Sequence, residues 1–223
     1  MNIKGIAHKT VWVDYPDIHT VYEKHNIEAI EKRPDGSPYY SLPIIYDPKS
    51  GKTIVDSLLI AEYLDETYPD TQRLVPEGTH MLHTTFMQSF RAALSEDFFD
   101  LVYSRTIVQL SPRGKEWYEK KLSARSKEWY DKNGWHREMK SEEDGLKEVQ
   151  KALDKVESWY KPGDKFASGS QKLIFADLMI AGFLVWAKIL LGEESAEWQD
   201  ILTWQNGRWK ALFDELKPFE QVL

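Results

Sequence analysis

The chain of 223 residues contains no cysteine, which excludes disulfides, thiolate metal sites and chemistry by a thiol of its own. It also has no excess of basic charge. The formal net charge is −7, and lysines and arginines are interspersed with acids, which argues against nucleic-acid binding. The longest apolar stretch, "LIFADLMIAGFLVWAKILL", is interrupted by Asp177 and Lys188, which argues against a membrane span. The start, "MNIKGIAHKT", lacks the apolar core of a signal peptide. We therefore expect a cytoplasmic protein that binds neither nucleic acid nor membranes.

Two kinds of pattern divide the chain. Short strand-like runs alternate with helical ones at the beginning, whereas beyond residue 80 the apolar periodicity is that of helices alone. The segment between them, "PDTQRLVPEGTH", is polar and carries two prolines and a glycine, as linkers do. The sequence thus predicts an α/β domain over residues 1–69, a linker over 70–79 and an all-helical domain over 80–223.

Residues 9–15, "KTVWVDY", are rich in β-branched and aromatic residues and predict a strand that stops at Pro16. The runs "SLPIIYD" and "KTIVDS" flank "PKSG" and predict an antiparallel hairpin, followed at once by a helix capped by Asp56 or Ser57. Pro43 is unexpected inside a strand-like run, because proline donates no ladder hydrogen bond.

Helical spacing dominates the rest of the chain. Leu82, Phe86, Phe90 and Leu94 recur at this spacing, and residues 173–190 are apolar on nearly every side. A helix that is apolar all round is buried, so the second of these segments is the expected centre of the helical domain.

The motifs "LPII", "VDSLLIAEYLDETYP" and "FADLMIAGFL", in this order, resemble those of the cytosolic glutathione transferases. The resemblance implies an α/β plus all-α fold, with a truncated thioredoxin-like domain before an all-helical one. The runs "KGIAHKTVWVDYPDI", "DGSPYYSLPIIYDPKSG" and "LSPRGKEWYEK" are similar to the fungal etherase-related class, Fua, which is related to bacterial β-etherases. The class implies a homodimer that uses glutathione as co-substrate to conjugate aromatic compounds or cleave their ethers, and that binds wood polyphenols. A non-catalytic carrier of aromatic ligands and a structural or regulatory protein with a degenerate glutathione site stay open as alternatives.

The resemblance also assigns glutathione-binding residues. In the family the proline follows a cis peptide bond, and the residue before it, here Leu42, pairs through its main chain with the cysteinyl part of glutathione. Asp56 and Ser57 match the acid and serine that hold the γ-glutamyl end. A helix N-terminus offers amides to a carboxylate, while Asp56 can accept from an ammonium group. Taken singly, a proline at a strand start is more often an edge device, and a serine at a helix start is more often a cap.

Phe86, Phe90 and Tyr103 are the candidates for an aromatic-substrate pocket, although single aromatic residues at helical spacing mostly belong to the core. His80 and His83 have the i, i+3 spacing of metal ligands, with Glu77 as the only nearby third group. Two surface histidines at a helix start are the favoured interpretation, and we expect no metal.

Two departures from the family pattern stand out. Family members begin with a strand, a loop bearing the hydroxyl or thiol that stabilises the glutathione thiolate, and a helix ending in something like "NIKGI", whereas this chain opens at that end. The catalytic residue is therefore expected in a preceding segment. An incomplete record of a normal enzyme, a short form without catalysis, and a sheet completed by another subunit remain open.

The second departure is Ile174, which stands where the family has the serine or threonine of a capping box with Asp177. We expect Asp177 to cap the helix still, with the hydroxyl bond lost at a cost of about 0.5–2 kcal/mol.

Overall fold

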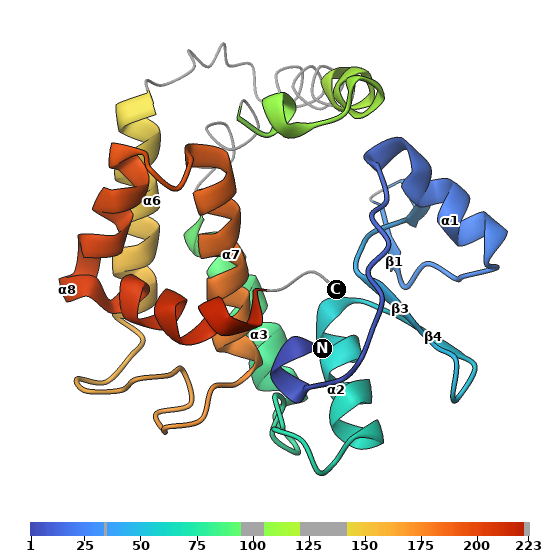
Figure 1. Ribbon diagram of the computed structural model, residues 1–223, viewed down its shortest axis with the longest axis horizontal. Helices are drawn as coiled ribbons and strands as arrows, with labels where there is room; N and C mark the ends of the chain where they lie inside the picture. The colour runs from blue at the N-terminus through green and yellow to red at the C-terminus, as the bar shows by residue number, and fades with distance from the viewer. Residues whose placement is uncertain (34, 95–104, 121–141, 221–223) are drawn as a thin grey trace.

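The computed structural model describes residues 1–33, 35–94, 105–120 and 142–220. A small region with short strands is followed by a larger helical one (Figure 1), which confirms the predicted α/β plus all-α fold. The elements of the first region are η1 (Asn2–Lys4), η2 (Tyr15–Asp17), α1 (Ile18–Lys24), β1 (Glu31–Lys32), β2 (Pro38–Tyr39), β3 (Ile44–Asp47), β4 (Lys52–Val55) and α2 (Ser57–Thr67). The second region contains α3 (His80–Ala93), helical residues 105–109 and 112–120, α6 (Glu142–Glu157), α7 (Phe175–Leu191), α8 (Ala196–Leu216) and η3 (Lys217–Phe219).

The hairpin of β3 and β4 agrees with the sequence prediction. Its antiparallel register runs from Ile44 opposite Val55 to Asp47 opposite Lys52. The loop between the strands closes through Gly51, whose φ of 70° lies in the left-handed region that glycine adopts without steric cost. The hairpin leads directly into α2, so that its open end and the start of this helix lie together.

The strand predicted over residues 9–15 is not formed. Residues 9–14 carry no regular structure, and the side chains of Val11 and Trp12 are 73% and 79% exposed. A strand needs a neighbour for its ladder hydrogen bonds, and in the described part of the chain β3 and β4 pair only with each other. A further two-stranded ladder, which the sequence did not predict, joins β1 to β2 with Glu31 opposite Tyr39.

The helical region is built around α7, as its apolar sequence predicts. In Figure 1, α7 lies among α3, α6 and α8, and its buried side chains belong to one continuous core. That core also contains Leu153 and Val156 of α6 and Trp198 and Trp209 of α8, all almost fully buried. Among the described residues, no helix is long and apolar enough to cross a membrane.

The histidine prediction is wrong for His83. This residue is only 4% exposed and lies edge-on to the ring of Phe175, with 5.8 Å between ring centroids. Leu82, which the apolar spacing placed inward, is 63% exposed instead. The reason is that α7 packs on the face of α3 that carries His83. In this turn of α3, His83 is therefore buried in place of the neighbouring Leu82.

The two regions meet along α2. Leu58 and Ala61 of α2 pack with Val75 and with Phe175 of α7 in a small apolar cluster. A buried ion pair lies beside it, because Lys4 Nζ stands 2.6 Å from Asp65 Oδ1 with both side chains at most 2% exposed. Asp65 also accepts hydrogen bonds from the main-chain amides of Leu74 and Val75. One carboxylate therefore joins η1, α2 and the connection to the helical region.

Candidate glutathione site and apolar groove

The peptide bond between Leu42 and Pro43 is cis, as the resemblance implied. It lies where the chain enters β3, and the Pro43 carbonyl accepts a hydrogen bond from the amide of Asp56 at 3.3 Å. The side chain of Leu42 is 41% exposed. Among the described residues, nothing hydrogen-bonds to the Leu42 amide or carbonyl. An exposed main chain with open donor and acceptor is suited to pairing with a peptide-like ligand.

Asp56 caps α2 in an unusual backbone conformation. Its φ is 78°, in a region that residues with a side chain rarely adopt, at a cost of about 1–3 kcal/mol. Its Oδ1 accepts hydrogen bonds from the amides of Leu58 and Leu59, at 2.8 and 3.2 Å. Oδ2 makes no hydrogen bond within the described part of the chain, so one carboxylate oxygen remains for a cationic group.

Ser57 is the first residue of α2 and is half-buried. Since Asp56 already satisfies the next two amides, the free donors at this helix start are the amide and the hydroxyl of Ser57, neither of which has a partner among the described residues. A helix N-terminus is expected to offer several free amides to a ligand, but here the Asp56 cap leaves one, that of Ser57. Leu42, Pro43, Asp56 and Ser57 come together at the open end of the hairpin.

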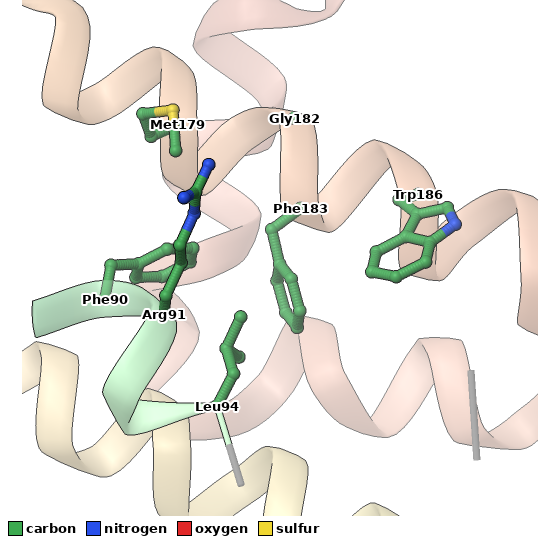
Figure 2. Close-up of a pocket in the computed structure, with 7 residues that line it drawn as sticks. All are labelled: Phe90, Arg91, Leu94, Met179, Gly182, Phe183 and Trp186. Carbon is green, nitrogen blue, oxygen red and sulfur yellow. The ribbon is translucent and has the colours of Figure 1, made fainter. Parts of the chain in front are cut away.

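An apolar groove of about 460 Å³ lies between α3 and α7 (Figure 2). Its lining residues are Phe90, Arg91, Leu94, Met179, Gly182, Phe183 and Trp186. Met179 also packs on the cluster that contains Leu58, the neighbour of Ser57 in sequence. One end of the groove therefore reaches the junction with α2.

The aromatic candidates fall differently with respect to this groove. Phe90 lines it, whereas Phe86 is a supporting residue, stacked on Phe90 at 5.9 Å and edge-on to Trp159. Tyr103 lies outside the described residues. No sequence pattern singled out Arg91, whose exposed side chain points along the groove in Figure 2. Its guanidinium makes no ion pair within the described part of the chain.

Asp177 has the structural role that the sequence predicted. Its carboxylate is fully buried and accepts from the amides of Ile174 and Ala167, both at 2.8 Å. Burial raises the pKa of this carboxyl above its ordinary value, against the effect of these hydrogen bonds. The aliphatic side chain of Ile174 offers no acceptor to the helix start, so only half of a capping box is present.

The side chains of His80 and His83, both on α3, lie in different surroundings. His80 Nδ1 lies 2.7 Å from Glu62 Oε1 on α2, and burial lowers the pKa of His83. Within the described ranges, no three histidine or acidic side chains are grouped as a metal site requires.

A second contact between the two regions was not predicted, and we call it the clasp. It joins residues 14–17 to residues 111–118. Asp14 accepts a hydrogen bond from Ser111, and Asp17 pairs with Arg113. Tyr15 stacks on Trp117 at 5.5 Å with an interplanar angle of 12°. The two class-typical sequences "VDYPDI" and "SPRGKEWY" therefore meet in space.

Gly114 makes this approach feasible, because a Cβ at this position would lie 2.5 Å from Asp14 Oδ1. The clasp lies apart from the α2 junction, so the described residues of the two regions meet at more than one place.

Comparisons with known proteins extend over the whole chain. Residues 1–72 match the model of the glutathione S-transferase N-terminal domain, and residues 81–219 match that of the glutathione S-transferase C-terminal domain. A glutathione S-transferase of Ceriporiopsis subvermispora, CsGST63524, solved in complex with glutathione, is 35% identical, with a TM-score of 0.88 over 100% of this chain and 88% of that one.

Two further relatives are informative. Glutathione transferase GSTFuA3 of Phanerochaete chrysosporium is 33% identical, with a TM-score of 0.85 over 100% of this chain and 87% of that one. The glutathione S-transferase-like protein ustS of Aspergillus flavus is 28% identical over 96% of this chain and 78% of its own length.

Proposed function

The chain belongs to the glutathione S-transferase family, in its fungal Fua class, and from this premise we propose that it binds glutathione at the open end of the hairpin. In this proposal the Leu42 main chain pairs with the cysteinyl residue of glutathione. The amide and hydroxyl of Ser57 bind the γ-glutamyl carboxylate, and Asp56 Oδ2 accepts from the ammonium group.

The observation that carries the proposal is the set of polar groups left without partners at this one place. The main chain of Leu42, Oδ2 of Asp56 and the two donors of Ser57 are unsatisfied in the described structure, although their neighbours are hydrogen-bonded. Glutathione offers a main-chain amide and carbonyl, a carboxylate and an ammonium group. Each open group thus has a counterpart of complementary charge or hydrogen-bonding type.

The proposed reaction is attack by the glutathione sulfur on an electrophilic carbon of an aromatic substrate. In the ether-cleaving form, a carbon–sulfur bond forms as the carbon–oxygen bond breaks, and the aryl oxygen leaves and takes up the proton lost by the thiol. The nucleophile belongs to glutathione, in keeping with a chain that has no cysteine. The described residues include no assigned catalytic hydroxyl.

The groove between α3 and α7 is the proposed site for the aromatic ligand. The rings of Phe90, Phe183 and Trp186 provide apolar contact area. Arg91 adds a positive charge that has no acidic partner among the described residues, which favours phenolates or aromatic carboxylates, and so suits wood-derived polyphenols.

Isothermal titration calorimetry with glutathione tests the binding site. We expect Ser57→Ala and Asp56→Asn each to weaken binding by about 10-fold or more, because each removes a hydrogen bond to a charged group. Asp56→Asn keeps an acceptor for the helix cap, so its effect on binding reports the loss of the negative charge rather than a loss of folding. Ser158→Ala is the matched control, since the Ser158 hydroxyl bonds only to Lys155 at an exposed helix end. Equal affinities in all four proteins would contradict the proposal.

A non-catalytic carrier of aromatic ligands is the second candidate, favoured by the groove. Both candidates predict quenching of tryptophan fluorescence by hydroxylated aromatics, with Trp186 in the groove as the reporter. They differ in glutathione-dependent cleavage of an aryl ether, which the carrier lacks. The homodimer implied by the family also stays a proposal, and sedimentation equilibrium tests it directly.

A further inference from the structure

Tyr22 of α1 holds both main-chain groups of Ser41, the residue before the cis-bonded pair. Its hydroxyl donates to the Ser41 carbonyl at 2.8 Å and accepts from the Ser41 amide at 3.3 Å. The side chain is only 1% exposed, so the phenol cannot easily exchange these partners for water. One buried side chain thus fixes both main-chain groups of one residue, Ser41, next to the proposed site.

The ring of Tyr22 is itself held in place. It packs against Tyr40 with 4.7 Å between centroids, and Tyr40 stacks on His19 of α1 at 4.8 Å. The helix therefore contacts two successive residues before Leu42, one through rings and the other through hydrogen bonds. Such packing keeps the phenol from turning away from Ser41.

The other side of Leu42 is also fixed. Pro43 accepts from the amide of Asp56 at 3.3 Å, which ties it to the start of α2. Leu42 thus lies between two anchored residues, while its own amide and carbonyl remain open. The direction of these two groups follows from the anchors, because the exposed Leu42 side chain contributes little to hold it.

We propose that Tyr22 is a positioning residue for glutathione, which fixes the orientation of the Leu42 main chain before the ligand arrives. This inference rests on the proposed function, in which Leu42 pairs with the cysteinyl part. Main-chain recognition depends on the direction of one N–H and one C=O, and a loop already ordered in the binding geometry loses less entropy on binding. Tyr22 makes no contact with the ligand in this account and acts through Ser41.

The test compares Tyr22→Phe with Tyr40→Phe. Both remove one hydroxyl from neighbouring tyrosines, but the Tyr40 hydroxyl has no hydrogen bond in the described structure. Glutathione affinity is measured by calorimetry well below the unfolding temperature of each variant, which is recorded separately. We expect Tyr22→Phe to bind glutathione about 10-fold more weakly, and Tyr40→Phe to stay within about 2-fold of the parent.

A second readout does not require ligand. In ¹H–¹⁵N spectra of the free protein, Tyr22→Phe should shift the Leu42 amide resonance, while that of Ala181 in the helical core stays in place. Tyr40→Phe should leave the Leu42 resonance nearly unchanged.

The outcomes separate the two proposals. If Tyr22→Phe lowers only the unfolding temperature and binds glutathione as the parent does, its role is structural and the inference is overturned. If Ser57→Ala alone then loses affinity for glutathione, the proposed glutathione site is still supported. If the parent chain does not bind glutathione at all, both proposals are overturned.

Discussion

The two regions of this protein are held in shape by different kinds of interaction. The helical region has a continuous apolar core, and most of its described residues lie on α3, α6, α7 and α8. In residues 1–69, the buried apolar side chains are few and lie mainly on α2. There, polar contacts fix the chain: Lys4 with Asp65, Tyr22 with Ser41, Asp56 with the start of α2, and Asp17 with Arg113.

This difference suggests that the helical region mainly provides stability, whereas the first region mainly provides ligand recognition. Apolar burial is non-directional and tolerates exchange of similar side chains, whereas a hydrogen bond fixes the direction of the groups it joins. The region proposed to bind glutathione needs oriented main-chain groups, and it is the region fixed by hydrogen bonds. The helical region provides a stable support and an apolar groove.

The largest effect is expected from Asp65→Ala. It leaves the buried Lys4 ammonium without its partner and the amides of Leu74 and Val75 without an acceptor. Breaking one side of a buried pair costs about 3–5 kcal/mol. Urea unfolding should show this loss in the free energy of unfolding, whereas Glu116→Ala, at the exposed pair with Lys120, should leave it nearly unchanged. A small effect for Asp65→Ala would mean that apolar contacts alone hold the regions together.

Asp177→Ala is expected to cost somewhat less. The amides of Ile174 and Ala167 lose their acceptor at the start of the central helix, at about 1–3 kcal/mol. Conversely, Ile174→Thr should complete the capping box and gain up to about 1 kcal/mol. Thermal unfolding of both variants measures the two effects. If Asp177→Ala is neutral, the loop before α7 is held by its apolar contacts instead.

A pH effect of intermediate size is expected at His83. Burial lowers its pKa from the ordinary value of 6.5, with Glu62 acting in the opposite direction and His80 in the same one. Below pH 6.5 the unfolded chain takes up a proton that the folded protein does not, so stability falls as the pH decreases towards the lowered value. The loss is at most about 1.4 kcal/mol per pH unit. Urea titrations at pH 7.5 and 5.5 should show a smaller difference for His83→Gln than for the parent. An unchanged difference would assign the slope to other groups.

The smallest effect is expected at the clasp. Arg113 is exposed and Asp17 partly so, and the hydrogen bond and charge of Asp17 raise the pKa of the guanidinium. Arg113→Gln should therefore lower the stability only slightly, and the difference should vanish at high salt. Gly114→Ala should cost more than Arg113→Gln, because its Cβ displaces Asp14. Hydrogen exchange of the α1 amides with and without added salt measures both. Equal exchange in both variants and the parent would show that the clasp does not restrain α1.

Much of the site could be predicted from the sequence, because its signals are local. The proline at 43, the turn at Pro48 to Gly51 and the acid and serine at 56 and 57 lie within one short segment, and each has a distinct chemical role. The apolar run of α7 likewise predicted the centre of the core.

Contacts between distant residues could not be predicted. Nothing in the sequence pairs Tyr22 with Ser41, Lys4 with Asp65 or Asp14 with Ser111, since each contact depends on how separate elements pack. The same is true of His83, whose burial is decided by the position of α7 rather than by the pattern of α3. The strand expected at residues 9–15 shows the limit of propensity, because β-branched residues favour a strand only where a neighbour exists.

Glutathione binding at the open end of the hairpin is tested most directly by titrating the parent chain with glutathione and recording ¹H–¹⁵N spectra. We expect the amide resonances of Leu42 and Ser57 to shift together, with one dissociation constant, while those of α6 and α8 remain in place. Shifts confined to the helical region, or none at Leu42 and Ser57 at saturating glutathione, would contradict it.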